Sequence, residues 1–159
     1  MSTSTSTNTK ANKKNLTSYW GIEFTDNTDT QLMAAAATTL VSLPNLVPLK
    51  KCHSTLLFVG KKVNPDEAVF ADFEGLPCIV IVDAFGFTQD ALAFRVKEIS
   101  TVESPPRNVP SFAAKQHITY ALRAGVAAKD SVKTLLGDGT VVELDSELIL
   151  TGKVKRFLY

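Results

Sequence analysis

The chain has 159 residues, of which 45% are hydrophobic and 21% are charged, which suits one compact domain or two small lobes sharing a core. Its 17 basic and 16 acidic residues leave a formal net charge of +1. Because duplex nucleic acid is bound through broad basic surfaces, this balance argues against a duplex DNA partner. It is compatible with a small nucleotide or an RNA end held in a pocket.

Cysteine content and hydropathy restrict the cellular setting. Cys52 and Cys78 are the two cysteines and have no short-range pairing, so neither a disulfide framework nor a zinc finger is expected. We expect reduced thiols and a cytoplasmic location. No apolar run reaches the length of a membrane span, and the N-terminus lacks the hydrophobic segment of a secretory signal. We therefore expect no membrane partner. We also expect a monomer.

The N-terminal quarter of the chain divides into a tail, a strand and a helix. Residues 1–17 are rich in Ser, Thr, Asn and Lys, which predicts a disordered tail ahead of a single domain at 18–159. The aromatic and β-branched residues of 19–24 predict a first strand. Capping residues at 25–27 and an alanine-rich middle predict a helix over 28–43.

The rest of the chain alternates short strands with short helices. Up to the middle we expect a loop marked by Pro44 and Pro48, a strand at 52–59, a helix at 65–73, a buried strand at 78–82 and a turn at Gly86. Beyond it we expect a half-buried strand at 91–99, an irregular connector at 102–111, a strand at 116–122, a helix at 129–136 closed by Gly137, an extended segment at 140–144 and a final strand at 148–158.

The two histidines of the chain occur in matching triplets, His53-Ser54-Thr55 and His117-Ile118-Thr119. Each triplet lies in a predicted strand. Because residues i and i+2 of a strand point to the same face, each histidine projects together with its threonine. If the two strands lie side by side, four polar side chains converge on one surface.

This quartet suits hydrolysis of a phosphodiester without a metal. One neutral imidazole can take a proton from water, and the other, as imidazolium, can protonate the departing oxygen. The threonine hydroxyls can donate hydrogen bonds to the phosphoryl oxygens. Spacing alone leaves open which histidine is the acid and which is the base.

Other interpretations of the histidines have less support. A single strand histidine beside a threonine commonly has a purely structural role. Two matched triplets, in a chain with no third histidine, favour a functional role over a structural one. A zinc site needs three or four protein ligands. Cys52 adjoins His53 in sequence but points to the opposite face of the strand, so it cannot serve as a zinc ligand beside His53. The same orientation argues against a Cys–His pair of the cysteine-protease type. No glycine-rich phosphate loop supports an NTPase. We expect no cofactor.

The paired triplets resemble those of the 2H phosphoesterase superfamily. Within it, the resemblance is to 2′,3′-cyclic nucleotide 3′-phosphodiesterases and to the cyclic phosphodiesterase domains of tRNA ligases, over roughly residues 18–159. The supporting segments are Tyr19-Trp20-Gly21, Cys52-His53-Ser54-Thr55, Lys115-Gln116-His117-Ile118-Thr119 and Ala127-Ala128-Lys129-Asp130. Ser54 departs from the apolar residue usual between His and Thr, which suggests a less buried strand face.

The resemblance implies a fold, a reaction and a binding pocket. The fold is α+β and bilobal, with two antiparallel sheets facing a central groove and helices outside. The reaction is the metal-independent opening of a 2′,3′-cyclic phosphate to a 2′-phosphate, with His117 activating water and His53 protonating the leaving oxygen. Phe58 matches a base-stacking position, and Tyr19 and Lys115 match further pocket positions. Strand parity directs Phe58 away from His53 unless a bulge intervenes.

Three functions compete on this basis. The first is an enzyme acting on 2′,3′-cyclic phosphates of RNA ends or nucleotides. The second is a related phosphodiesterase that degrades 2′,5′-oligoadenylate or cyclic oligonucleotide messengers, as viral and phage members of the superfamily do. The third is a non-catalytic RNA- or nucleotide-binding module, against which the intact His and Thr residues weigh.

Overall fold

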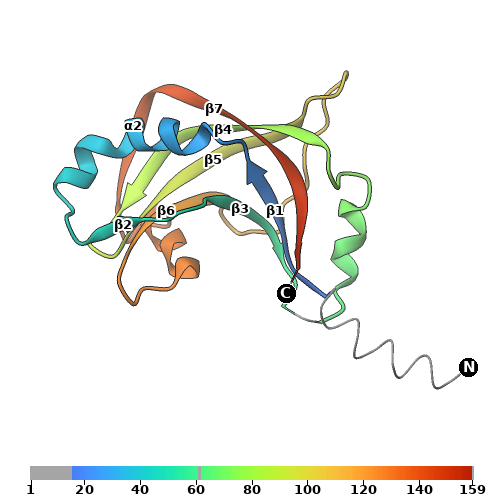
Figure 1. Ribbon diagram of the computed structural model, residues 1–159, viewed down its shortest axis with the longest axis horizontal. Helices are drawn as coiled ribbons and strands as arrows, with labels where there is room; N and C mark the ends of the chain where they lie inside the picture. Colours follow the sequence, from blue (N-terminus) through green and yellow to red (C-terminus); the bar gives the residue numbers. More distant parts are fainter. Residues whose placement is uncertain (1–15, 61, 159) are drawn as a thin grey trace, which may run out of the picture.

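One antiparallel sheet that closes on itself forms the body of the protein (Figure 1). The computed structural model describes residues 16–60 and 62–158. Within these residues the strand order is β2-β6-β3-β1-β7-β4-β5, and β6 also pairs with β5, which closes the ring. The strands are β1 (Thr17–Phe24), β2 (Leu46–Pro48), β3 (His53–Phe58), β4 (Pro77–Phe87), β5 (Ala91–Thr101), β6 (His117–Arg123) and β7 (Thr140–Leu158).

The α+β class expected from the sequence is found, but the arrangement of the strands differs from two separate sheets. β6 pairs with β3 on one side and with β5 on the other, so the strands of both halves belong to one closed sheet. The two connections of β6 are unequal. Five residue pairs join it to β5, whereas the single pair Ser54↔Ile118 joins it to β3.

Two strands are longer than the sequence patterns predict. β4 continues through Gly86 to Phe87, so the turn expected at Gly86 is wrong. The segments expected at 140–144 and 148–158 are one strand, β7, which pairs with both β1 and β4. Strands of this length are possible because their partners continue beside them and satisfy the backbone groups of both.

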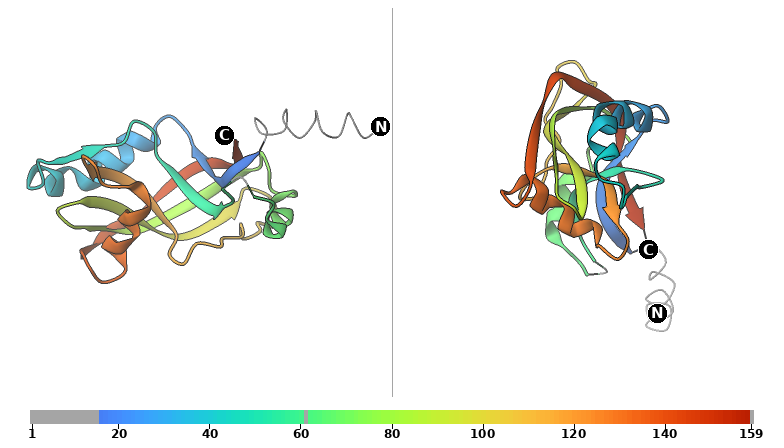
Figure 2. Two further views of the ribbon diagram at one scale, coloured as in Figure 1. Left: turned by 90° about the horizontal axis from the view of Figure 1, so that it is seen from below. Right: turned by 90° about the vertical axis from the view of Figure 1, so that its left-hand side faces the viewer.

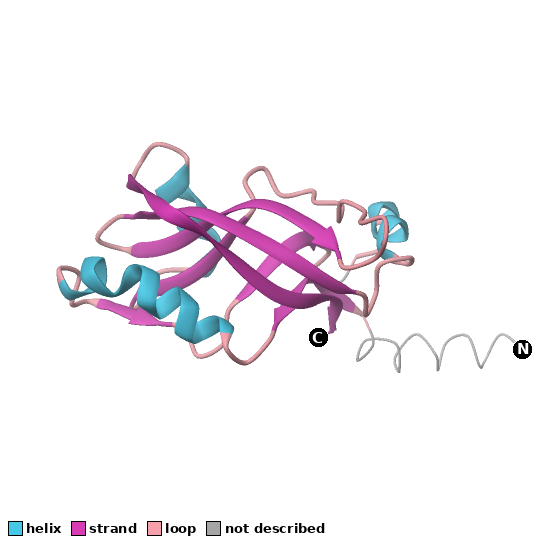
Figure 3. Cartoon of the chain, turned by 90° about the horizontal axis from the view of Figure 1, so that it is seen from above, coloured by secondary structure: helices cyan, strands magenta, loops and turns pink. Residues whose placement is uncertain are grey.

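The helices lie against the outside of the sheet (Figures 2 and 3). α2 (Thr28–Val41) agrees with the predicted helix and buries Leu32 and Ala36. The two short helices predicted later are 3₁₀ segments, η2 (Pro65–Phe70) and η3 (Ala128–Leu135). Segments of six to eight residues gain little from α-helical hydrogen bonding, and 3₁₀ geometry is common in such short pieces.

The interior is apolar and includes both cysteines. Its largest fully buried side chains include Phe70, Phe94 and Ile22. Burying side chains of this size contributes about 1.5–3 kcal/mol each. Cys52 and Cys78 are free thiols in this interior, and burial raises their pKa values to about 12 and about 11. Both thiols therefore stay protonated and unreactive near neutral pH.

The tail predicted at 1–17 lies outside the described residues except for its last two positions. Thr17 is buried and already belongs to β1. Among the helices of the described ranges, none combines the length and the apolar character that crossing a membrane requires.

Gly86 allows η3 to approach the sheet. A Cβ atom at Gly86 would overlap the carbonyl oxygen of Thr134, which lies on η3. A Cβ atom at Gly139 would also overlap this carbonyl oxygen. The absence of a side chain at Gly86, inside a long strand, therefore allows η3 to lie close to β4.

We predict that Gly86→Ala lowers the free energy of unfolding by about 1–3 kcal/mol, because η3 must move away from the strand. Urea denaturation of the purified protein measures this. Thr140→Ala, at an exposed position on the neighbouring strand β7, is the control and should change stability by less than about 0.5 kcal/mol. Equal effects of the two substitutions would contradict the close approach.

Candidate active site

The structure brings the two His-x-Thr triplets together at the single pair that joins β3 to β6. Ser54 lies opposite Ile118, and both side chains are fully buried in the interior. Because the strands are antiparallel, His53 lies across from Thr119, and Thr55 lies across from His117. All four side chains point to the outer face of the sheet, away from Ser54 and Ile118. The four side chains are half-buried and share this outer face, with each histidine diagonal to the other.

Side-chain hydrogen bonds strengthen the short connection between β3 and β6. The Ser54 hydroxyl donates to the carbonyl oxygen of His117 at 2.9 Å. The Gln116 amide nitrogen donates to the Ser54 hydroxyl and, at 2.9 Å, to the carbonyl oxygen of Thr55. Ser111 donates to the carbonyl oxygen of the Gln116 side chain. Ser54 was expected on a less buried face, which is wrong, because its hydroxyl is satisfied within the interior.

A backbone contact fixes the orientation of His117. Its Nδ1 lies 2.9 Å from the carbonyl oxygen of Lys115. A carbonyl oxygen can only accept, so Nδ1 is the donor and Nε2 is left for proton transfer. Of the three residues assigned to the binding pocket, Lys115 contacts the quartet in this way through its backbone, and its side chain is half-buried.

Aromatic rings surround His53. The centroid of the Tyr19 ring lies 4.9 Å from that of His53, and the Phe157 ring lies at 5.9 Å. Tyr19 and Phe157 stack on each other at 4.4 Å. Burial lowers the pKa of His53 below its ordinary value of 6.5, and the proximity of His117 adds to this effect. His53 is therefore neutral at pH 7, the form that can accept a proton.

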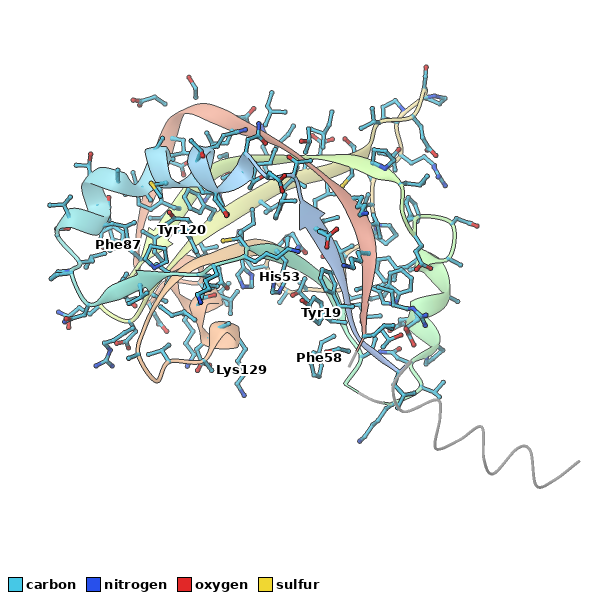
Figure 4. All side chains as sticks on the ribbon, in the orientation of Figure 1. Tyr19, His53, Phe58, Phe87, Tyr120 and Lys129 are labelled. Carbon is cyan, nitrogen blue, oxygen red and sulfur yellow. The ribbon has the colours of Figure 1, made fainter. Side chains whose placement is uncertain are left out.

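η3 holds the hydroxyl of Thr119. This hydroxyl is hydrogen-bonded to that of Ser131, which is fully buried, and lies 3.4 Å from the carbonyl oxygen of Ala128. In Figure 4, Lys129, which follows Ala128, lies below His53 and to the left of Tyr19 and Phe58.

A bulge reorients the end of β3. Trp20 pairs with Leu57, but Gly21 pairs with Thr55, so one residue of β3 is left without a partner. Phe58 then pairs with Tyr19 and is 68% exposed. Because the bulge adds one residue to β3, the Phe58 side chain points to the same face as His53. A cavity of about 280 Å³ adjoins the site here and is lined by Thr55, Leu56, Leu57, Phe58, Phe112 and Ala113.

Several contributors to the site have weak sequence signals. Ser54 and Gln116 lie within or next to the triplets, so adjacency alone could have drawn attention to them. Phe157 follows the alternation of the last strand, but its contact with Tyr19 depends on the pairing of β1 with β7. Phe112 lies in a proline-rich connector, where no periodicity predicts the direction of a side chain.

Within residues 16–60 and 62–158, no three His, Cys, Asp or Glu side chains are arranged so that they could hold a metal ion. Cys52 adjoins His53 in sequence but is buried in the interior, on the other side of the sheet.

Comparison with known proteins identifies the fold and no family. No protein-family model matches the sequence, and no curated protein matches it. Among solved structures, the chain is similar to a fungal RNA kinase, with a TM-score of 0.62 and 13% sequence identity. The similarity covers 88% of this chain and 46% of the kinase chain, so this protein spans less than half of that length. At this identity the likeness establishes a shared fold.

We predict that Ser54→Ala lowers the free energy of unfolding by about 1–3 kcal/mol, because it leaves the carbonyl of His117 and one Gln116 proton without their partner. Urea denaturation gives this value. Ser100→Ala on β5 is the matched control and should cost less than about 1 kcal/mol. A Ser54→Ala protein as stable as the control would show that the connection between β3 and β6 does not depend on this hydroxyl.

Proposed function

We propose that this protein is a metal-independent phosphodiesterase of the 2H phosphoesterase type, which opens 2′,3′-cyclic phosphates of RNA ends or nucleotides to 2′-phosphates. The observation that supports this best is the diagonal His/Thr arrangement around the pair Ser54↔Ile118. A phosphoryl group above this pair has one imidazole and one hydroxyl on each side. Acid and base can therefore act on opposite sides of the phosphorus atom.

The reaction is an in-line displacement by water. One histidine removes a proton from the attacking water as the new phosphorus–oxygen bond forms. The bond between phosphorus and O3′ breaks, and the other histidine gives its proton to O3′. The product keeps its phosphate on O2′, and a proton exchange with solvent restores the two rings. General acid–base catalysis of this kind contributes about 10²–10⁴-fold for each group.

We assign the base to His53 and the acid to His117. Burial favours neutral His53, which is the form a base requires. The carbonyl of Lys115 accepts from Nδ1 of His117, which orients that ring and leaves its Nε2 for proton transfer to the leaving oxygen. This assignment is the reverse of the one that the family resemblance implies.

The threonines bind the phosphoryl oxygens in this proposal. If Ser131 donates to Thr119, the Thr119 hydroxyl proton can turn from the carbonyl oxygen of Ala128, 3.4 Å away, to a non-bridging oxygen. Thr55 adjoins the cavity lined by Phe58 and Phe112, both of which are exposed. An aromatic ring at the edge of such a cavity can stack on a nucleobase. In this proposal the Tyr19 ring packs against His53 and holds it in place. Lys115 contributes mainly through its backbone carbonyl, which orients His117.

Two further considerations support an RNA substrate over other phosphodiesters. The structural neighbour is an RNA kinase, and the shared fold is compatible with an RNA substrate for this chain. The near-zero net charge suits recognition of an end in a pocket better than recognition of a long duplex.

We predict that the protein hydrolyses 2′,3′-cyclic AMP and RNA ending in a cyclic phosphate equally well with and without EDTA. His53→Ala and His117→Ala should each lower kcat by about 10²–10⁴-fold at unchanged thermal stability. Chromatography of the products measures both, and the position of the phosphate identifies the bond that breaks. Persistence of both substrates would reject the proposal. Turnover only of 2′,5′-oligoadenylate or cyclic dinucleotides would favour a messenger-degrading enzyme instead.

We predict that kcat/KM falls at low pH with a midpoint below about 6.5, because His53 must be neutral and burial lowers its pKa. A substrate with sulfur in place of O3′ needs no protonation of its leaving group. This substrate should restore most of the activity of His117→Ala and none of that of His53→Ala. The opposite pattern of rescue would assign the acid to His53.

A further inference from the structure

Three lysines surround one carboxylate next to the candidate active site. Glu23 at the end of β1 lies 2.7 Å from the Lys155 ammonium, 3.4 Å from that of Lys51 and 3.7 Å from that of Lys153. The lysine side chains are 43%, 71% and 55% exposed, whereas Glu23 is 18% exposed. The carboxylate therefore lies beneath the three ammonium groups, which face solvent.

The charges in this cluster do not cancel. The lysines hold the pKa of Glu23 below its ordinary value, so the carboxylate is ionised at neutral pH. One negative charge against three positive charges leaves a local surplus of two. The whole chain has a net charge of +1. Such a local excess of positive charge attracts anions.

The strand register places this cluster on the face that presents the quartet. Glu23 pairs with His53 on one side and with Lys153 on the other. Gly21 pairs with Thr55 and with Lys155 in the same way. Directly paired residues of neighbouring strands point to one face. Two rows therefore run from β3 across β1 to β7, namely His53–Glu23–Lys153 and Thr55–Gly21–Lys155.

The distance and the intervening residues suit an extended polyanion. Two strand spacings separate His53 from Lys153, which is about 10 Å, and a lysine side chain reaches several ångströms further. At the middle of one row Gly21 has no side chain, and the space beside it is bordered by the rings of Tyr19 and Phe157. Lys155 also lies 5.1 Å from the centre of the Phe157 ring, which belongs to the aromatic wall beside His53.

We infer that Lys153 and Lys155, with Lys51 beside them, bind the phosphates of the nucleotides that precede a cyclic-phosphate end, so that the preferred substrate is a single-stranded RNA end and not a free cyclic nucleotide. This inference rests on the proposed function for its placement of the reacting end. The aromatic cavity at Phe58 adjoins Thr55 at the β3 end of one row, on the side away from the lysines, and is left for a base. An anionic membrane is the other polyanion that could contact lysines, but it would not explain their alignment with the quartet.

The test compares two substrates in one set of variants. Lys153→Gln/Lys155→Gln should raise KM for a pentanucleotide ending in a 2′,3′-cyclic phosphate about tenfold and change KM for 2′,3′-cyclic AMP less than about twofold. Lys153→Arg/Lys155→Arg should keep both values near those of the unaltered protein. Lys97→Gln/Lys133→Gln removes the same charge elsewhere and is the matched control.

A binding measurement makes the inference independent of turnover. The affinity of the protein for the 2′-phosphate pentanucleotide is measured by fluorescence anisotropy at about 50 to 200 mM salt. The slope of log Kd against log salt should fall by about 1.4 in Lys153→Gln/Lys155→Gln, since each phosphate contact to a single strand contributes about 0.7. The control variant should keep the original slope.

Different outcomes separate the two proposals. An unchanged KM and an unchanged salt slope for the pentanucleotide in Lys153→Gln/Lys155→Gln would overturn this inference. Equal increases in KM for the pentanucleotide and for 2′,3′-cyclic AMP would also overturn it. A protein that hydrolyses neither substrate, yet binds the pentanucleotide with the expected salt slope, would reject the proposed function and keep the RNA-binding surface. Binding to phosphatidylserine vesicles that these lysines control, at unchanged RNA affinity, would assign them to a membrane and overturn the inference.

Discussion

The hydrogen bond from Ser54 to the carbonyl of His117 is the interaction on which the candidate site depends. β3 and β6 share a single residue pair, and the two histidines lie on either side of it. Without a longer ladder, the alignment of the strands relies on Ser54 and on the Gln116 amide, which reaches from β6 to β3. A short connection has an advantage here, because it leaves the outer face uncovered where the four polar side chains converge.

The surroundings of the quartet are chemically unequal. His53 lies against stacked aromatic rings that exclude water and lower its pKa, whereas the Nδ1 of His117 is bound to a backbone carbonyl. η3 holds Thr119, and Thr55 borders an open cavity. The same sheet therefore supplies a neutral ring at His53 and, at His117, a ring whose Nδ1 is held by a backbone carbonyl. This difference, more than the triplets themselves, is what divides the acid and base roles in our proposal.

The sequence predicted the local features of the site better than their connections. The period of two along a strand was sufficient to put His53 with Thr55 and His117 with Thr119. Closure of the sheet through β5 and β6 joins residues far apart in the chain, and no local pattern encodes it. The bulge in β3 near Trp20 turns the Phe58 side chain to the face of His53, and no pattern in the sequence predicts this bulge. The sequence predicts a turn at Gly86, because glycine is typical both of turns and of close backbone packing.

The diagonal arrangement of the quartet has a stereochemical consequence. A cyclic phosphate turned by half a revolution above the pair Ser54↔Ile118 would meet the same functional groups in exchanged positions. The ribose would then present O2′ where O3′ had been, and the opposite phosphate isomer would be released. The regiochemistry of the product is thus controlled by the asymmetric margins of the site, where the ribose and base lie, and not by the four residues that surround the phosphorus atom.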